Sequence, residues 1–281
     1  MSTHMSRFQD NKEAVYPTLM LAVFFFIPFL IMFSVSFFNR DEGAFFQPAF
    51  ELDNYVRFLA PFFGKVLLTS LGLSMAAALI SVSIAVPFTY LVTRMSVIRQ
   101  SIILVFLLSV LSLSEVIIGF AWSTLLSRTA GIGNLLAALG ILGTSQSFTP
   151  SLGALLLGLT YLGFPYAVLV IYPALSRLDP EIPEAARMLG ASPVKSFLNV
   201  TIPVMRNTII GALILVFVFT LGAYLLPQVL GRPQHWTLSV HITDQAIFQS
   251  NLPFAAAMAV FLMLVSLALV GLSTLLGKRK T

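Results

Sequence analysis

The sequence predicts an all-α integral membrane protein with six transmembrane helices. Of the 281 residues, 58% are apolar and only 10% are charged, whereas soluble domains carry about a quarter charged residues. The mean hydropathy is +0.94. Six apolar stretches reach roughly 20 residues, the length that a helix needs to cross a bilayer core about 30 Å thick. The expected spans are residues 16–38, 66–93, 101–127, 152–175, 208–230 and 254–276.

The first span stands out as strongly apolar. It holds fourteen Leu, Ile, Val or Phe residues between Leu19 and Phe38, which together favour insertion by roughly 4 to 8 kcal/mol. The run is longer than the apolar core of a cleavable signal, and no small-residue cleavage site follows it, so we expect it to be retained. Residues 1–15 are therefore expected to form a cytoplasmic segment and residues 16–281 a single transmembrane domain.

The distribution of basic residues predicts the orientation. With both termini in the cytoplasm, eleven of the sixteen basic residues face inward, as the positive-inside rule prefers. The expected inner residues are Arg7, Lys12, Arg94, Arg99, Arg177, Arg187, Lys195, Arg206, Lys278, Arg279 and Lys280. The expected outer residues are Arg40, Arg57, Lys65, Arg128 and Arg232.

Composition also excludes several function classes. The chain has no cysteine, which removes disulfide scaffolds, thiol catalysis and cysteine-ligated metal centres. Its basic residues flank apolar runs, so its net charge of +5 predicts contact with membrane lipid and no nucleic-acid partner. His235, His241 and Asp244 share an outer loop, where we expect a polar surface and not a metal site. No arrangement of side chains predicts catalysis.

The second span is rich in small residues between Ser70 and Ala85. Small side chains allow helices to approach closely. We therefore expect this span to pack inside the bundle or against a partner.

The cytoplasmic loop 176–207 carries the most specific pattern. Asp179 followed by Pro180 predicts a helix start, and Gly190 stands where a left-handed residue would end that helix. Ser192 followed by Pro193 repeats the start pattern, which predicts a second short helix through about residue 199. Two short helices joined at a glycine are therefore expected on the inner face. An ordinary interfacial loop is the alternative.

Within this loop the chain resembles the EAA loop of ABC importer permeases. The matching residues are Glu184-Ala185-Ala186, then three residues, Gly190, nine residues, and Val200-Thr201-Ile202-Pro203. Residues 50–55 and 253–257 also resemble segments of these permeases, so the resemblance covers most of the chain from about residue 50. It implies the type I ABC importer permease fold.

The resemblance also implies a mechanism with partners. Glu184, Ala185, Ala186, Gly190 and Pro203 would couple the permease to a cytoplasmic ATP-binding subunit dimer. This chain lacks a phosphate-binding loop, so ATP and magnesium would be held by that partner and no cofactor by this chain. A second permease subunit, favouring a heterodimer, and a periplasmic or extracellular solute-binding protein are also implied, in a multi-pass protein of the bacterial inner membrane.

The candidate translocation path rests on Glu115, Tyr90, Trp122, Tyr161 and Tyr224, all in or near spans. Glu115 costs about 2.5 to 3.5 kcal/mol to insert within a span, so it needs a partner or a cavity. The alternative for Glu115 is a structural carboxyl bonded to another span or capping a helix. The alternative for the aromatic residues is packing or anchoring at the membrane interface.

Among such permeases the layout most resembles the spermidine/putrescine group, which favours a polyamine-like or related small organic solute moved by alternating access. The sequence around residues 113–119 departs from the third span typical of the first polyamine permease. A self-contained secondary transporter or a channel is the competing function. A secondary transporter would show inverted repeats and discontinuous helices, and neither is expected from this sequence.

Overall fold

A computed structural model describes the backbone of residues 3–278 apart from residues 42, 44–45, 130 and 142, and side chains from residue 15 to residue 271 with the same gaps. The described chain is helical and has no strand. The longer helices, in chain order, are α1 (Thr3–Val35), α3 (Pro61–Val92), α4 (Val97–Leu111), α5 (Glu115–Leu125), α7 (Leu152–Ser176), α11 (Arg206–Gly222) and α14 (Leu252–Lys278). The shorter elements are α2 (Asp53–Phe58), α6 (Ile132–Ala138), α8 (Glu181–Met188), α9 (Pro193–Ser196), η1 (Phe197–Thr201), α10 (Ile202–Val204), α12 (Leu225–Leu230), η2 (Pro233–His235), α13 (Leu238–Thr243) and η3 (Asp244–Phe248).

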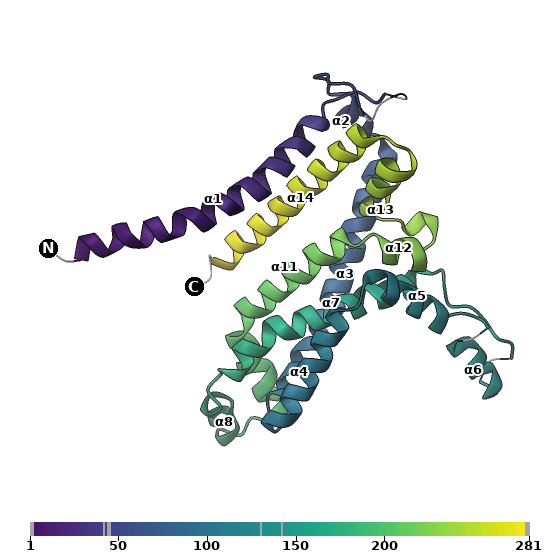
Figure 1. Cartoon of the computed structure of the whole chain (residues 1–281). Helices are drawn as coiled ribbons and strands as arrows, with labels where there is room; N and C mark the ends of the chain where they lie inside the picture. Colours follow the sequence, from purple (N-terminus) through teal and green to yellow (C-terminus); the bar gives the residue numbers. More distant parts are fainter. Residues whose placement is uncertain (1–2, 42, 44–45, 130, 142, 279–281) are drawn as a thin grey trace. The chain divides into compact units, whose positions relative to one another are not determined.

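Two compact units make up the chain. One comprises Met1–Pro61 and His241–Val265, and the other comprises Phe62–Val240 and Ser266–Thr281. Figure 1 labels the helices of both units.

In the first unit, aromatic rings run along α1 at four-residue spacing. The ring of Phe29 stacks on that of Phe33, with centroids 6.2 Å apart, and Phe33 meets Phe37 at 5.2 Å. Just after the end of α1, the hydroxyl group of Ser36 is hydrogen-bonded to that of Tyr55 in α2, at 2.7 Å. The rings contact one another because residues four apart share one face of a helix. The Ser36–Tyr55 hydrogen bond joins α2 to the segment that follows α1.

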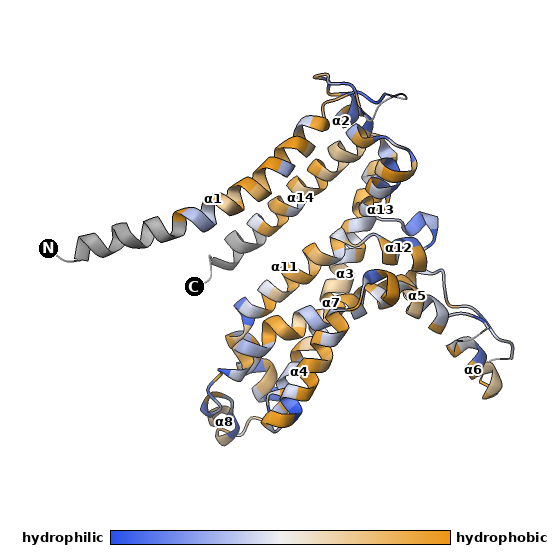
Figure 2. Ribbon diagram, in the orientation of Figure 1, coloured by the Kyte–Doolittle hydropathy of each residue, from blue (hydrophilic) through white to orange (hydrophobic). Residues whose placement is uncertain are grey.

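The second unit is built on α3, α7 and α11. Small residues of α3 form a buried stripe at the spacing of one helix face: Ser70, Ser74, Ala77, Ala78, Ser81 and Ala85. The Ser81 hydroxyl donates to the Thr160 carbonyl of α7 at 3.1 Å. Of the two alternatives expected for the second span, packing inside the bundle or against a partner, the structure shows the first. Figure 2 shows hydrophobic residues along nearly the whole of α4, α7 and α11.

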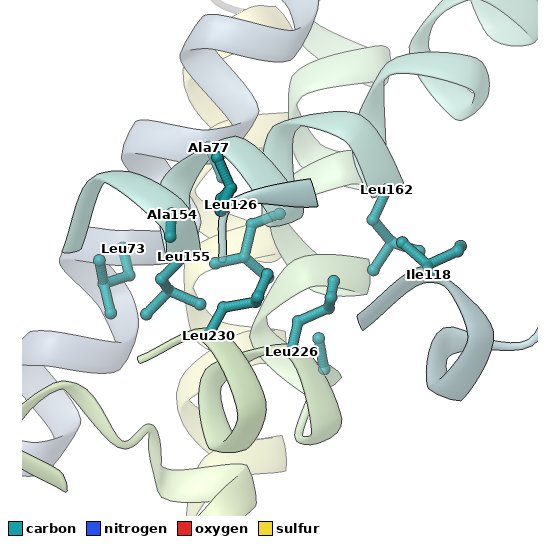
Figure 3. Packing of buried hydrophobic residues seen from close by; sticks show 11 residues of the cluster. Leu73, Ala77, Ile118, Leu126, Ala154, Leu155, Leu162, Leu226 and Leu230 are labelled. Atoms are coloured by element: carbon teal, nitrogen blue, oxygen red, sulfur yellow. The ribbon is translucent and has the colours of Figure 1, made fainter. Parts of the chain in front are cut away.

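Leucines from four helices form the core next to the broken helices. Leu226 and Leu230 of α12 pack against Leu155 of α7 and Leu126 at the end of α5, with Leu73 of α3 in the same cluster (Figure 3). Leu155, Leu226 and Leu230 have no exposed surface. Burying such side chains is worth roughly 2 kcal/mol each, so this cluster fixes α12 against α7 and α5.

Spans one, two, four and six are continuous helices, but the expected third and fifth spans are broken. The third consists of α4 and α5, which meet at 97° across residues 112–114. The fifth consists of α11 and the short α12, which are separated by Ala223 and Tyr224. Among the described residues, four helices are long and apolar enough to cross a membrane. The number is up to six if two bent pairs each count as one span: α4 with α5, and Pro193–Val204 with α11. Hydropathy detects the apolar length of a segment but not a break within it.

Candidate functional site

The loop between α7 and α11 folds largely as expected. The Asp179 carboxylate accepts the backbone N–H of Glu181 at 3.0 Å, and α8 follows from Glu181. Gly190 has a φ of 93°, the left-handed conformation predicted for it. The Ser192 hydroxyl accepts the N–H of Lys195 at 3.3 Å, so the second start pattern is also confirmed.

The second short helix is longer than predicted. It does not stop near residue 199 but continues from α9 through a π-helical turn, η1, into α10, and ends at Val204. Pro203 occupies the first turn of α10. The direction then changes by 73° into α11. The loop therefore joins α11 through a rigid helical arm and a sharp corner.

A buried hydrogen bond holds the two short helices together. The Ser196 hydroxyl is 1% exposed and donates to the Pro183 carbonyl of α8 at 2.8 Å. The opposite side of α8 is open: Glu184 and Ala185 are exposed and Ala186 is half-buried. Met188 and Leu189, at the end of the helix, are each 90% exposed. α8 is thus held in place by α9, and the apolar side chains at its C-terminal end are exposed.

Tyr90 lies next to this loop and not with the other aromatic candidates. Its ring contacts that of Phe197 in η1, with centroids 4.6 Å apart, and the guanidinium of Arg94 lies 4.4 Å above the Tyr90 ring. Tyr90 therefore connects α3 to the loop between α7 and α11. It does not line the pockets described below.

Glu115 lies at the break between α4 and α5, not deep in a continuous span. The Ser114 hydroxyl accepts the N–H of Val116 at 3.3 Å and caps α5, with Glu115 as its first residue. Oε1 of Glu115 accepts the backbone N–H groups of Leu225 and Leu226 at 3.1 and 3.0 Å. One carboxylate thus caps the start of α12, in the second broken span. Glu115 therefore makes the kind of contact expected of a structural carboxyl, because it is bonded to another span and caps a helix.

A pocket of about 460 Å³ opens beside this junction. Its lining comes from α4, α5, α7 and α11 and includes Glu115, Tyr161, Tyr166 and Phe219, with Ala223 at the break after α11. Irregular backbone within apolar spans is tolerated where it lines a cavity, and Leu113 and Ala223, at the two breaks, line this pocket. The lining is chiefly apolar and includes one acidic residue and two tyrosines.

The remaining candidates surround this pocket to different degrees. Trp122 meets Tyr161 edge to face, with centroids 5.5 Å apart, and both line a neighbouring pocket of about 240 Å³. Tyr224 occupies the break before α12 and is absent from both linings. Sequence reasoning did not select Phe219, whose ring lies 4.2 Å from that of Tyr166. The Ser114-Glu115 start pattern was the sequence feature that could have located the junction.

The outer loop after α12 carries no metal cluster in the part of the chain that the structure describes. Burial lowers the pKa of His241 below its ordinary value of 6.5, while the nearby Asp244 carboxylate opposes that shift. The N–H of Arg232 donates to Nδ1 of His235 at 3.3 Å. These groups take part in local structure.

Comparison with known proteins gives the family. Residues 101–281 match the family described as binding-protein-dependent transport system inner membrane component. The chain belongs to this family. It is 30% identical over 247 residues to the spermidine/putrescine transport system permease protein PotB of Escherichia coli strain K12, covering 87% of this chain and 89% of that protein. The chain is thus a membrane-embedded, multi-pass permease component of an ABC importer.

Solved structures support the permease fold. The bacterial ABC transporter that imports the acidic polysaccharide alginate matches with a TM-score of 0.74 at 17% identity, covering 99% of this chain and 98% of that one. A second structure of that transporter contains an alginate pentasaccharide-bound periplasmic protein and matches with the same TM-score and identity, covering 99% and 96% of the two chains. The type I importer fold implied by the loop is confirmed.

One expectation about the permease is wrong. Discontinuous helices were not expected, and their absence was an argument against a secondary transporter. Two expected spans are discontinuous. The family match, and not helix continuity, is what separates this chain from a self-contained secondary transporter or a channel.

Proposed function

We propose that this permease moves a small organic solute, polyamine-like or related, by alternating access driven by a separate ATP-binding subunit dimer. The observation that carries the proposal is the α8 helix, whose Met188 and Leu189 are each 90% exposed at the inner loop. Apolar side chains left open at the end of a capped helix are suited to enter a groove on a partner. Glu184, Ala185 and Ala186 belong to the same surface.

Stiff contacts along the loop 176–207 support this mechanism. The Ser196–Pro183 hydrogen bond ties α9 to α8, and helical backbone continues from α9 to Val204 at the corner with α11. Phe197 meets Tyr90 of α3. A push on α8 would therefore reach two membrane helices through packed contacts, as a rigid-body displacement and not as the bending of a flexible loop.

The proposal includes the partners and the orientation. Both termini and the loop 176–207 face the cytoplasm. ATP and magnesium are held by the partner dimer, because this sequence has no glycine-rich loop followed by Lys and Ser or Thr. A second permease subunit completes the pore, in a heterodimer, and an external solute-binding protein delivers the solute.

Single cysteines test the docking, since the natural chain has none. Leu189→Cys should form a crosslink with the ATP-binding subunit that is encoded with this chain, when membranes carrying both proteins are treated with a short bifunctional maleimide. Leu139→Cys is the matched control, because Leu139 is also well exposed, at 64%, but lies at the end of α6 in an expected outer loop. It should give no such crosslink.

The same two variants test the orientation. A membrane-impermeant maleimide added to intact spheroplasts should label Leu139→Cys and leave Leu189→Cys unlabelled until the membrane is broken. Equal crosslinking of both cysteines, or labelling of Leu189→Cys from outside, would contradict the proposed function.

A further inference from the structure

The pocket at the broken spans carries one formal charge, and it is negative. Among the described residues, Glu115 is the only Asp, Glu, Lys, Arg or His that lines it. The relatives named above differ in the charge of their cargo: PotB is named for spermidine and putrescine, and the matching structure imports an acidic polysaccharide. Fold and family therefore leave the charge of the solute open. The pocket is a separate observation on that question.

Only one of the two carboxylate oxygens of Glu115 is hydrogen-bonded within the described chain. The backbone N–H groups of Leu225 and Leu226 donate to Oε1, and Oε2 has no hydrogen bond to any described residue. The hydroxyl groups of Tyr161 and Tyr166 also lack hydrogen bonds within the described chain. Glu115, Tyr161 and Tyr166 therefore line one pocket, and each has an oxygen atom with free hydrogen-bonding capacity. A ligand that donates several hydrogen bonds would satisfy them.

Three aromatic residues, Tyr161, Tyr166 and Phe219, belong to the lining of the pocket, and the rest of the lining apart from Glu115 is aliphatic. Tyr161 is held edge to face against Trp122, and Tyr166 is packed against Phe219. These contacts fix the positions of the two tyrosine rings before a ligand arrives. Aromatic faces attract an ammonium group through their quadrupole and repel an anion. The rings and the carboxylate thus favour the same sign of ligand charge.

We propose that this pocket binds a protonated amine of the transported solute, with Oε2 of Glu115 as its counter-charge. The inference rests on the proposed import function and gives that function a site and a ligand chemistry. A volume of about 460 Å³ accommodates a small organic ammonium. An oxyanion would meet a carboxylate and no basic side chain, so the site selects against it.

Glu115 serves two roles that one substitution separates. In Glu115→Gln the side-chain carbonyl can still accept the Leu225 and Leu226 N–H groups, while the negative charge is removed. Amine affinity should fall by about tenfold or more, the change expected when a charge-assisted hydrogen bond is lost. Tyr161→Phe removes only one hydroxyl and should weaken amine binding by a few fold. Glu51→Gln, an exposed acidic residue outside the pocket, is the matched control and should bind as the wild type does.

Equilibrium dialysis of radiolabelled putrescine and spermidine against the full chain in lipid nanodiscs measures the affinity. The location of binding is measured by fluorescence: the chain has two tryptophans, so Trp236→Phe leaves Trp122, which contacts the pocket residue Tyr161, as the only emitter. Both amines should bind saturably and change the Trp122 emission. Sodium sulfate at equal ionic strength should do neither.

Several outcomes would overturn the site. These are the absence of saturable amine binding to the wild type, equal affinity in Glu115→Gln, or an equal effect of sulfate. This assay contains no ATP-binding subunit, so it is independent of the Leu189→Cys crosslink. Failed amine binding with a successful crosslink rejects the pocket and keeps the importer; amine binding with a failed crosslink does the opposite.

Discussion

The inner loop, residues 176–207, and the junction of the two broken spans at Glu115 belong to the same unit but are stabilised in opposite ways. In the loop, the contacts of Asp179, Ser192 and Ser196 reach partners two, three and thirteen residues away. At the junction, Glu115 reaches N–H groups 110 and 111 residues away. The conformation of the loop is therefore determined by nearby residues, and the end of α8 is exposed. The junction exists only when two distant spans have met.

This difference follows from the surroundings of each region. The loop is expected to project into water, which can satisfy any backbone group that the helices leave open. The junction interrupts two apolar spans, where an unpaired N–H costs several kcal/mol. A side chain from another span must therefore supply the acceptor. Changes at the junction should affect folding, and changes in the loop should affect transport with folding intact.

The largest effect is expected from Glu115→Ala. This change leaves the N–H groups of Leu225 and Leu226 without their acceptor, at a cost of about 2 to 4 kcal/mol in the free energy of unfolding. Thermal unfolding of the detergent-purified chain should show a clear loss of stability, and uptake should fall with it. Glu115→Gln should remain close to wild type in stability. If the two variants unfold alike, the capping contact is not what stabilises the junction.

A smaller effect on folding, but a full loss of uptake, is expected from Gly190→Val. The φ of 93° suits glycine, and a β-branched residue there costs about 1 to 2 kcal/mol. No atom lies within 4 Å of the position that a Cβ would take, so the effect is confined to the backbone. Membrane insertion should be unchanged while solute uptake is lost.

Gly190→Asn is the control for that experiment. Asparagine tolerates left-handed conformations better than valine, so most uptake should remain. Equal uptake by both variants would mean that the turn between α8 and α9 is not part of the coupling.

A partial effect is expected from Tyr90→Ala, which removes the ring that joins α3 to the loop. The aromatic contact with Phe197 contributes about 1 kcal/mol beyond its buried area. Uptake should fall several-fold while the ATP-binding subunit stays bound, as judged by co-purification. Tyr90→Phe keeps the ring and should restore uptake. Loss of the bound subunit in Tyr90→Ala would instead indicate a docking role.

The smallest effect is expected from Ser196→Ala. It removes one buried hydrogen bond to Pro183 and should destabilise the α8–α9 pair by about 1 kcal/mol. Hydrogen exchange of α8 amides should become faster, while the amides of α7 and α11 keep their protection. Faster exchange in α7 as well would show that the loop is coupled to the bundle more tightly than its local contacts imply.

The sequence predicted the parts of this structure that depend on neighbouring residues. Apolar length located the spans, because a helix in lipid must satisfy its own backbone. The Asp179, Gly190 and Ser192 patterns located the inner helices, because capping acts within a few residues. The small residues of α3 predicted its buried face, because side-chain size limits how closely two helices approach.

Only the tertiary structure decided how the third and fifth spans are interrupted. The break at residues 112–114 contains no glycine or proline, and hydropathy is insensitive to backbone direction. Which carboxylate caps α12 depends on two segments far apart in the sequence. The assignment of Tyr90 to the loop instead of the pocket also required coordinates, since its span gives only its sequence position. Short-range sequence patterns determine where helices form. The junction and its pocket form only when helices that are distant in the sequence pack against one another.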